Sequence, residues 1–433
     1  MIKSSKRILI SAVLASAVSL QADWKADAGD VIQIALPVAA LGGTYIADDT
    51  EGRWMLVKGF GLNMATVHTT KQLVGKWRPR GQNADSFPSG HTAAAFGGAT
   101  FIQTRYGYSY GVPAYALATF VGYSRITSEN HYADDVVAGA SVAMLSNWAF
   151  TEPFVDDVTL SATMKNGGVT LAANIPIGGD EVKTEPTTAI EDVAFKPDVR
   201  FVFEFGGAWM YKNEIKSPGE GGDTIDFNTY SGTADPTSSI RSGFEFYFDD
   251  KNELFIQFSP YEMRVLGSLP HDTNFNGKTY TASTAEDDTF MAYRWNEYRA
   301  RWRYSLIDSK DFVLKLGAGM SISENQVELS DVQSVSSNVG REVVSSVTAM
   351  PIGHIHTGMK VGAQGELYAE VDAGGGGNEY ILDATLQYRY KMSKHWDVGG
   401  GYRYQSVRVD SSKLYNHFSV DNFVMNLGYS FTY

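Results

Sequence analysis

The sequence has no cysteine in its 433 residues. The chain therefore forms no disulfide bond and carries no thiolate nucleophile and no cysteine-ligated zinc. Charged residues are also scarce, at 20%, and the balance is acidic, with a net charge of −13. This charge argues against a nucleic-acid partner. Mean hydropathy is −0.20 and long apolar blocks are missing, which argues against a bundle of membrane-spanning helices.

Apolar and aromatic residues are plentiful, at 43% and 13% of the chain. This composition excludes a disordered chain, and the length favours two or more domains. At the N-terminus, Lys3, Lys6 and Arg7 precede an apolar run, 8–20, and Ala22 ends a segment that suits cleavage. We predict a signal peptide over 1–22. An uncleaved membrane anchor is the alternative, but the run is too short for one.

Residues 23–177 are predicted to form an all-α helical domain that ends in a β-hairpin. Apolar stretches rich in alanine and glycine predict helices over 31–47, 54–75, 92–104, 113–122 and 134–150. None has 18 uninterrupted apolar residues, so we expect buried helices of a compact soluble bundle. Alternation around Asn166 and Gly167 predicts the hairpin over 156–176. The acidic segment 178–197 is predicted to be a linker.

Residues 198–433 alternate apolar and polar side chains over long stretches rich in tyrosine and tryptophan. This pattern predicts a transmembrane antiparallel β-barrel with one face in lipid and the other in a polar lumen. Ten strands are expected, over 198–211, 240–249, 253–266, 293–306, 311–324, 346–360, 365–373, 378–391, 395–409 and 419–433. Eight strands is the alternative, because Pro351 and the glycines of 374–377 weaken two of them.

The connections between these strands alternate between short and long, which is typical of outer-membrane barrels. A soluble β-sandwich is the alternative, but its outer strand faces would not be so aromatic. The terminal run that ends in Tyr433 resembles the C-terminal signal of bacterial outer-membrane barrels. Short turns follow the even-numbered strands, so the first strand would start in the periplasm and the helical domain would lie there too.

The helical half carries three clusters of residues suited to phosphate chemistry. Lys71, Arg78 and Arg125 are cations, and arginine offers a planar fork for two phosphate oxygens. His131 and Asp135 are four residues apart and share one face of a helix. Asp135 would accept a hydrogen bond from one ring nitrogen of His131 and leave the other free to attack. The clusters are Lys71 with Arg78 and Pro79; Pro88, Ser89, Gly90 and His91; and Ser124, Arg125, His131 and Asp135.

The spacing and order of these clusters resemble the signature of the type 2 phosphatidic acid phosphatase and vanadium haloperoxidase superfamily. The resemblance covers about 30–150 and does not reach the barrel. It implies a phosphohistidine on His131, orientation of that ring by Asp135, and acid–base catalysis by His91. It also implies that Lys71, Arg78, Arg125, Ser89 and the Gly90 backbone hold the phosphoryl oxygens, with no cofactor or metal. Lys76 and Arg80 are expected to be solvated, and Asp134 to be a charge in the first helical turn.

The sequence thus favours a phosphatase anchored in the outer membrane, with its helical domain in the periplasm. Its partners would be outer-membrane lipid and a phosphomonoester or diphosphate substrate, a small ester or a lipid such as phosphatidic acid or lipid A. Many relatives are inner-membrane enzymes, but a barrel reaches the outer membrane by complete export, which favours the soluble branch of the superfamily. Two alternatives stay open: a porin-like or structural barrel with a phosphate-binding domain, and a vanadium haloperoxidase.

Other polar groups of the barrel have simpler interpretations. Its inward charges are expected to pair with one another and fill the lumen. His354 and His356 share a strand face, but no third ligand is near them in the sequence. His417 and Ser419 resemble the His-x-Ser of outer-membrane lipid A deacylases and are expected to face outward, but the glutamate of that family is missing. The inward charges are Glu204, Arg299, Arg301, Arg303, Lys315, Glu366, Glu370, Asp383, Arg389, Asp397 and Arg403.

Overall fold

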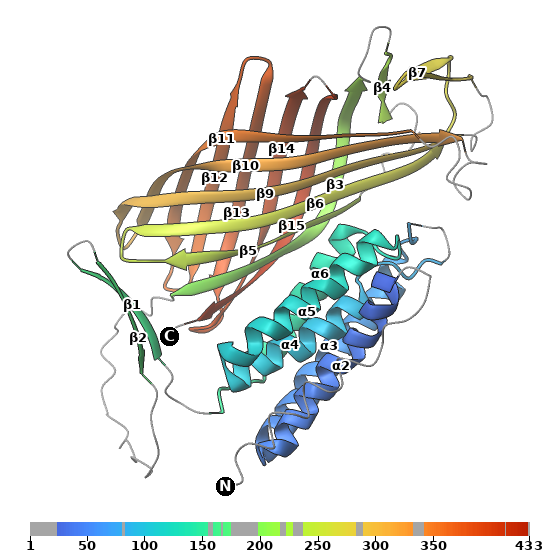
Figure 1. Cartoon of the computed structure of the whole chain (residues 1–433). Helices are drawn as coiled ribbons and strands as arrows, with labels where there is room; N and C mark the ends of the chain where they lie inside the picture. Colours follow the sequence, from blue (N-terminus) through green and yellow to red (C-terminus); the bar gives the residue numbers. More distant parts are fainter. Residues whose placement is uncertain are drawn as a thin grey trace. The chain divides into compact units, whose positions relative to one another are not determined.

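The chain divides into two compact units at about residue 193, and each is described here by itself (Figure 1). The structure, a computed structural model, describes residues 24–79, 83–154, 159–165, 168–174, 198–216, 222–227, 237–282, 289–331, 342–411 and 413–431. The predicted signal peptide and the predicted linker lie outside these residues, so both stay predictions.

The described part of the first unit contains five helices, as the apolar stretches predicted. They are α2 (Trp24–Ile46), α3 (Thr50–Val74), α4 (Gly90–Tyr106), α5 (Tyr108–Thr127) and α6 (Ala133–Trp148). Polar caps and glycines set their ends. The Asp49 side chain accepts the Gly52 N–H at the start of α3, and Gly75 ends that helix in a left-handed conformation with φ 59°. Ser89 caps α4, and its hydroxyl accepts from Thr92.

The interior of this unit consists mostly of small side chains. Ala95, Ala99, Ala118 and Val121 form a core in which α2, α4 and α5 meet. Because alanine and glycine fill the inside, many large apolar side chains are left outside, which corrects the expectation of buried helices. On α2, Ile34 is 61% exposed and Val38 is 60% exposed. Among the described residues, α2 is the one helix long and apolar enough to cross a membrane, and 22% of that stretch is buried.

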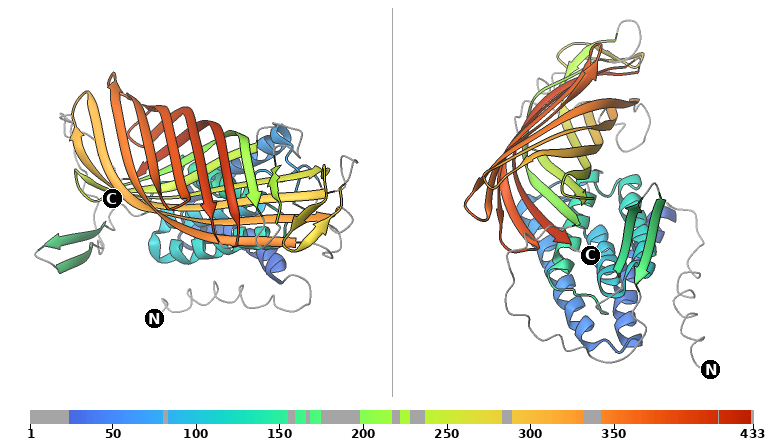
Figure 2. Two further views of the ribbon diagram at one scale, coloured as in Figure 1. Left: turned by 90° about the horizontal axis from the view of Figure 1, so that it is seen from above. Right: turned by 90° about the vertical axis from the view of Figure 1, so that its left-hand side faces the viewer.

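Strands β1 (Thr159–Lys165) and β2 (Gly168–Asn174) pair as an antiparallel hairpin at the predicted position. The second unit is a closed antiparallel barrel of ten strands, and the eight-stranded alternative is wrong (Figure 2). The last strand closes it on the first, with Phe431 paired to Val199. The barrel strands are β3 (Val199–Lys216), β5 (Thr237–Tyr247), β6 (Asn252–Gly267), β9 (Thr289–Asp308), β10 (Phe312–Asp331), β11 (Glu342–Val361), β12 (Gly365–Gly376), β13 (Glu379–Lys391), β14 (Trp396–Asp410) and β15 (Tyr415–Phe431).

Several strands are longer than the alternation predicted, and β11 passes through Pro351 without a break. Strand β12 pairs with Ile352–Val361, so Pro351 has a strand partner on the β10 side alone. Proline is tolerated where one side of a strand needs no backbone donor. Three short strands lie outside the closed ring: β4 (Thr224–Asp226) pairs with the end of β3, and β7 (Thr273–Phe275) pairs with β8 (Lys278–Tyr280).

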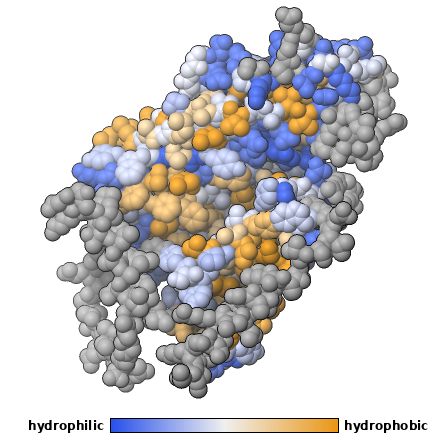
Figure 3. All heavy atoms as spheres, in the orientation of Figure 1, coloured by the Kyte–Doolittle hydropathy of each residue, from blue (hydrophilic) through white to orange (hydrophobic). Residues whose placement is uncertain are grey.

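The wall of the barrel alternates as predicted, with apolar and aromatic side chains outside. On β9, Tyr298 and Trp302 are 49% and 46% exposed, whereas Arg301 between them is 1% exposed. Figure 3 shows apolar side chains gathered over the barrel strands on the face in view. The inside has two layers. Ion pairs fill the end that carries the short turns, and an apolar cluster around Tyr293, Trp295 and Phe418 fills the end of the long loops.

Candidate functional site

The three sequence clusters meet at one end of the helical unit. Lys71 lies in the last turn of α3, and His91 lies in the first turn of α4 behind its cap, Ser89. Arg125 lies near the end of α5, and Asp135 lies in the first turn of α6. Their charges act on one another: Arg125, His131 and Arg78 all influence the pKa of His91. The fold thus brings all the predicted site residues to one place.

His131 is buried, with its side chain 1% exposed, and faces the carboxylate of Asp135. The distance from His131 Nδ1 to Asp135 Oδ2 is 3.5 Å, the outer limit of a hydrogen bond, and Nδ1 has no other hydrogen-bond partner. Burial lowers the pKa of His131 below its ordinary value, although Asp135 acts in the opposite direction. A low pKa keeps the ring neutral, as a nucleophile must be.

Asp135 is held by a network of donors that the sequence did not reveal. Its Oδ2 accepts from the Ser86 hydroxyl at 2.5 Å and from the Tyr132 N–H at 2.9 Å. Its Oδ1 accepts from Lys76 Nζ at 3.0 Å. Burial alone would raise the pKa of Asp135, but Lys76 and His131 lower it by more, so the pKa lies below its ordinary value. Asp135 is thus an ionised partner for His131.

Lys76 differs from its predicted solvated position, whereas Asp134 lies in the first turn of α6, as predicted. Asp134 is 2% exposed, and its two oxygens accept from Lys76 Nζ at 2.6 and 2.8 Å. Lys76 is 21% exposed and lies 4.2 Å above the Tyr132 ring. The sequence gave no signal for this bridge, because the lysine and the aspartates are far apart along the chain. Arg80, the other cation expected to be solvated, lies outside the described residues.

The groups proposed to hold phosphate surround the start of α4. Lys71 Nζ donates to the Asp85 carbonyl at 2.5 Å, and Arg78 donates to the Asn83 side chain at 2.9 Å. Burial and the neighbouring Arg78 lower the pKa of Lys71 to about 8. Ser89 is fully buried against α6, where a Cβ on Gly139 would lie 2.5 Å from the Ser89 carbonyl oxygen. The glycine thus lets α6 approach the start of α4, whose free N–H groups favour an anion.

His91 and Arg125 share a partner from α2. Asp30 Oδ1 accepts from Arg125 Nη1 at 2.6 Å and lies 3.2 Å from His91 Nε2. Burial and the positive charge of Arg125 lower the pKa of His91 to about 4. Asp30 is a site residue that sequence reasoning missed, since it precedes the first cluster by some forty residues. In the described part of the chain, no group of three or more histidine and carboxylate side chains is arranged to hold a metal ion.

Residues 54–156 match the PAP2 superfamily. The helical unit contains a PAP2 domain. A lipid A 1-phosphatase of Porphyromonas gingivalis is 43% identical to this chain over 90 residues, which are 20% of each protein. The chain therefore matches a fifth of the length of this relative.

Solved structures resemble each unit. LpxE of Aquifex aeolicus is 22% identical and covers 33% of this chain and 91% of its own, with a TM-score of 0.23. A PAP2-type phosphatidylglycerolphosphate phosphatase of Bacillus subtilis is 20% identical, covering 34% of this chain and 86% of its own, with a TM-score of 0.26. The outer-membrane protease OmpT of Escherichia coli is 11% identical, covering 55% and 99%, with a TM-score of 0.37. These scores are low, and the barrel is defined by its own strand pairings.

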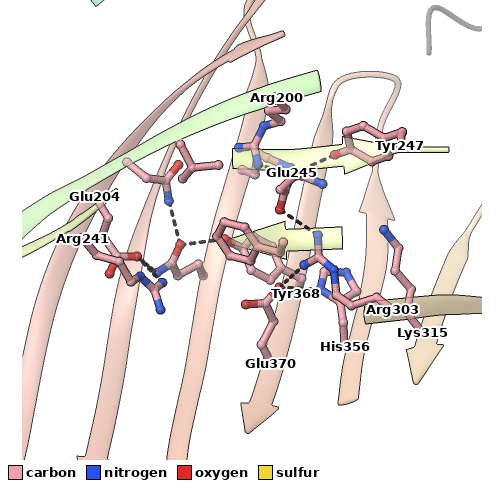
Figure 4. Close-up of a pocket in the computed structure, with 15 residues that line it drawn as sticks. Arg200, Glu204, Arg241, Glu245, Tyr247, Arg303, Lys315, His356, Tyr368 and Glu370 are labelled. Atoms are coloured by element: carbon pink, nitrogen blue, oxygen red, sulfur yellow. Dashed lines mark hydrogen bonds and ion pairs between the residues drawn. The ribbon is translucent and has the colours of Figure 1, made fainter. Parts of the chain in front are cut away.

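The polar groups inside the barrel form ion pairs, as expected. They surround a cavity of about 40 Å³ (Figure 4). His354 and His356 each contact a carboxylate of β12, Asp372 at 2.7 Å and Glu370 at 2.9 Å. On the outer wall, the Tyr380 hydroxyl lies between His417 and Ser406. It is 2.9 Å from His417 Nε2 and 3.2 Å from Ser406 Oγ.

Proposed function

We propose that the chain is a phosphatase that hydrolyses phosphate esters through a phosphohistidine. One observation carries the proposal: a neutral, buried His131, backed by the ionised Asp135, stands in a group of cations at the start of α4. The first step forms the bond from His131 Nε2 to phosphorus and breaks the bond to the leaving oxygen, which takes a proton from the protonated form of His91. The negative charge of a bound phosphate favours this form and opposes the effect of burial and Arg125 on the pKa of His91. In the second step, His91 removes a proton from water, whose oxygen displaces the histidine and releases phosphate.

The remaining groups have roles in binding. Lys71, Arg78 and Arg125 would balance the charge on the phosphoryl oxygens, and the Ser89 hydroxyl and Gly90 N–H would donate to them. The positive charge of these side chains is sufficient for the mechanism, which uses no metal or cofactor.

We infer further that the substrate is a lipid phosphate. Large apolar side chains accompany the site residues along the chain: Leu73 is 80% exposed, Trp77 is 62% exposed and Tyr123 is 50% exposed. Exposed aromatic and aliphatic groups beside a charged site suit a lipid whose headgroup enters while its chains stay outside. The name of the Porphyromonas relative, a lipid A 1-phosphatase, agrees with this inference.

We place the protein in the outer membrane, with the PAP2 domain in the periplasm. The closed barrel with an apolar outer wall supports the first statement, and the short turns on the side where β3 begins support the second. The filled lumen disfavours the porin alternative: Arg299 contacts Glu297, Asp372 and Asp383 and is fully buried.

The test uses the purified chain in detergent, with an aryl phosphate and a phosphatidic acid as substrates. His131→Ala should reduce turnover by about a thousandfold, and wild type should carry a transient phosphoryl group on the peptide that contains His131. His68→Ala is the matched control, because His68 is exposed on α3 and should be dispensable. Full activity in His131→Ala would contradict the assignment, and halide oxidation dependent on vanadate would favour the haloperoxidase alternative.

A further inference from the structure

Asp30 brings a negative charge into a site that is otherwise built to bind an anion. It lies on α2, outside the residues that match the PAP2 superfamily. One of its oxygens accepts from Arg125 Nη1 at 2.6 Å and lies 3.2 Å from His91 Nε2. These are the groups to which the mechanism assigns a phosphoryl oxygen and the leaving oxygen. The carboxylate of Asp30 therefore lies beside the leaving group.

Close packing of α2 on α5 fixes Asp30 in this position. A Cβ on Gly29 would lie 2.2 Å from Ser124 Oγ and 2.7 Å from Arg125 Nη2, so a side chain at position 29 would push the helices apart. Arg125 also donates from Nη2 to the Ala26 carbonyl at 2.6 Å and from Nε to Ser124 Oγ at 3.1 Å. The guanidinium thus holds the first turns of α2 to the end of α5.

The two sides of the site differ in charge as a result. Lys71 donates to a backbone carbonyl, and Arg78 donates to the Asn83 amide oxygen and to the Asn130 carbonyl, so these hydrogen bonds leave both positive charges uncompensated. Arg125, by contrast, is paired with a carboxylate, that of Asp30, which is 53% exposed. The phosphoryl side is cationic, and the side of His91 carries the negative charge.

We propose that Asp30 determines leaving-group specificity: it accepts phosphomonoesters of neutral alcohols and rejects diphosphates. This proposal rests on the proposed function, in which His91 faces the leaving oxygen. In a monoester, the atom beyond that oxygen is a carbon, which brings no charge close to Asp30. In a diphosphate it is a second phosphorus, whose charged oxygens would lie within a few ångströms of the carboxylate.

The test measures binding rather than turnover, so it does not depend on catalysis. Isothermal titration of the full chain in detergent compares inorganic phosphate with methylenediphosphonate, which cannot be hydrolysed. Asp30→Asn should raise the affinity for the diphosphonate, relative to phosphate, by about a hundredfold, which is the repulsion expected between two charges about 6 Å apart near a protein surface. Asp30→Glu keeps the charge and should keep the discrimination.

Asp27→Asn is the matched control, because it removes one exposed charge from the same helix and should leave the affinity ratio unchanged. A ratio that stays the same in Asp30→Asn, or that changes equally in Asp27→Asn, would overturn the proposal, as would failure of both anions to bind wild type. If wild type hydrolyses no phosphate ester but Asp30→Asn changes the affinity ratio by about a hundredfold, Asp30 has the proposed effect on anions and the phosphatase assignment is wrong.

Discussion

Lys76 offers a sharp test of how the site keeps its nucleophile ready. Its ammonium group lies 2.6 Å from Asp134 Oδ2 and 3.0 Å from Asp135 Oδ1, and these carboxylates are 2% and 0% exposed. In Lys76→Met, both carboxylates would stay buried without their cation. Breaking a buried ion pair from one side costs about 3–5 kcal/mol, so the helical unit should unfold at a clearly lower temperature.

The same change should alter the pH dependence of activity. Among the groups that lower the pKa of Asp135, Lys76 has the largest effect, so without it the pKa rises. A depressed carboxylate pKa stabilises the fold above the unfolded value, near 3.9, and that stability is lost as the pH falls through the folded value. In Lys76→Met, Asp135 would bind a proton in mildly acidic solution and cease to support His131, so the acidic limb of the rate should move to higher pH.

The assay is kcat/KM for an aryl phosphate across the pH range, together with thermal unfolding followed by the helical circular dichroism signal. Lys76→Arg keeps the charge and should keep most of the activity, and Lys58→Met removes an exposed lysine of α3 as a control. If Lys76→Met had the acidic limb and the unfolding temperature of wild type, Lys76 would not hold Asp135 in its ionised form.

Three further predictions concern the rest of the molecule. Burial lowers the pKa of Lys71 to about 8, so inhibition by phosphate should weaken as the pH rises through that value. Lys71→Arg should move this loss of inhibition to higher pH. If the loss stayed at the same pH in Lys71→Arg, Lys71 would not be the group that causes it. Arg299→Met should destabilise the barrel by about 3–5 kcal/mol, because it removes the ion pair of the buried Glu297 and one of the two described ion pairs of Asp383, and the unheated gel form should convert at a lower temperature. Protease added to whole cells should spare the 178–197 linker, and its cleavage with the outer membrane intact would refute the periplasmic placement.

The fold was largely predictable because its patterns are local. Each barrel strand alternates apolar and polar residues in the sequence, because one face of each strand is apolar and the other is polar. This alternation predicted every barrel strand. Strand ends were less visible: β10 and β11 extend beyond the predicted strands because they pair with each other there, and pairing between strands is not local information. The apolar layer at the long-loop end was also missed, since Tyr293 and Trp295 share a face with the charged residues of β9.

The candidate site likewise contains residues that the sequence predicted and residues that it did not. The eight predicted site residues belong to three clusters with fixed spacings, so the sequence alone located them. Lys76, Ser86 and Asp30 act through contacts across 49 to 95 positions, and nothing in their neighbourhood distinguished them from surface residues. Exposure in the helical unit was mispredicted for a simpler reason: a core of alanine and glycine leaves little room for the larger apolar side chains of the same helices.

Closure of the barrel by β15 and β3 has a consequence for the order in which the protein assembles. Phe431 must find Val199, so the ring cannot form until the last residues of the chain have been delivered. The contacts of the helical site all lie between residues 24 and 154 and need nothing from the barrel. A chain that lost β15 would thus keep an intact site yet carry two unpaired strand edges, on β3 and β14, which invite pairing with other chains.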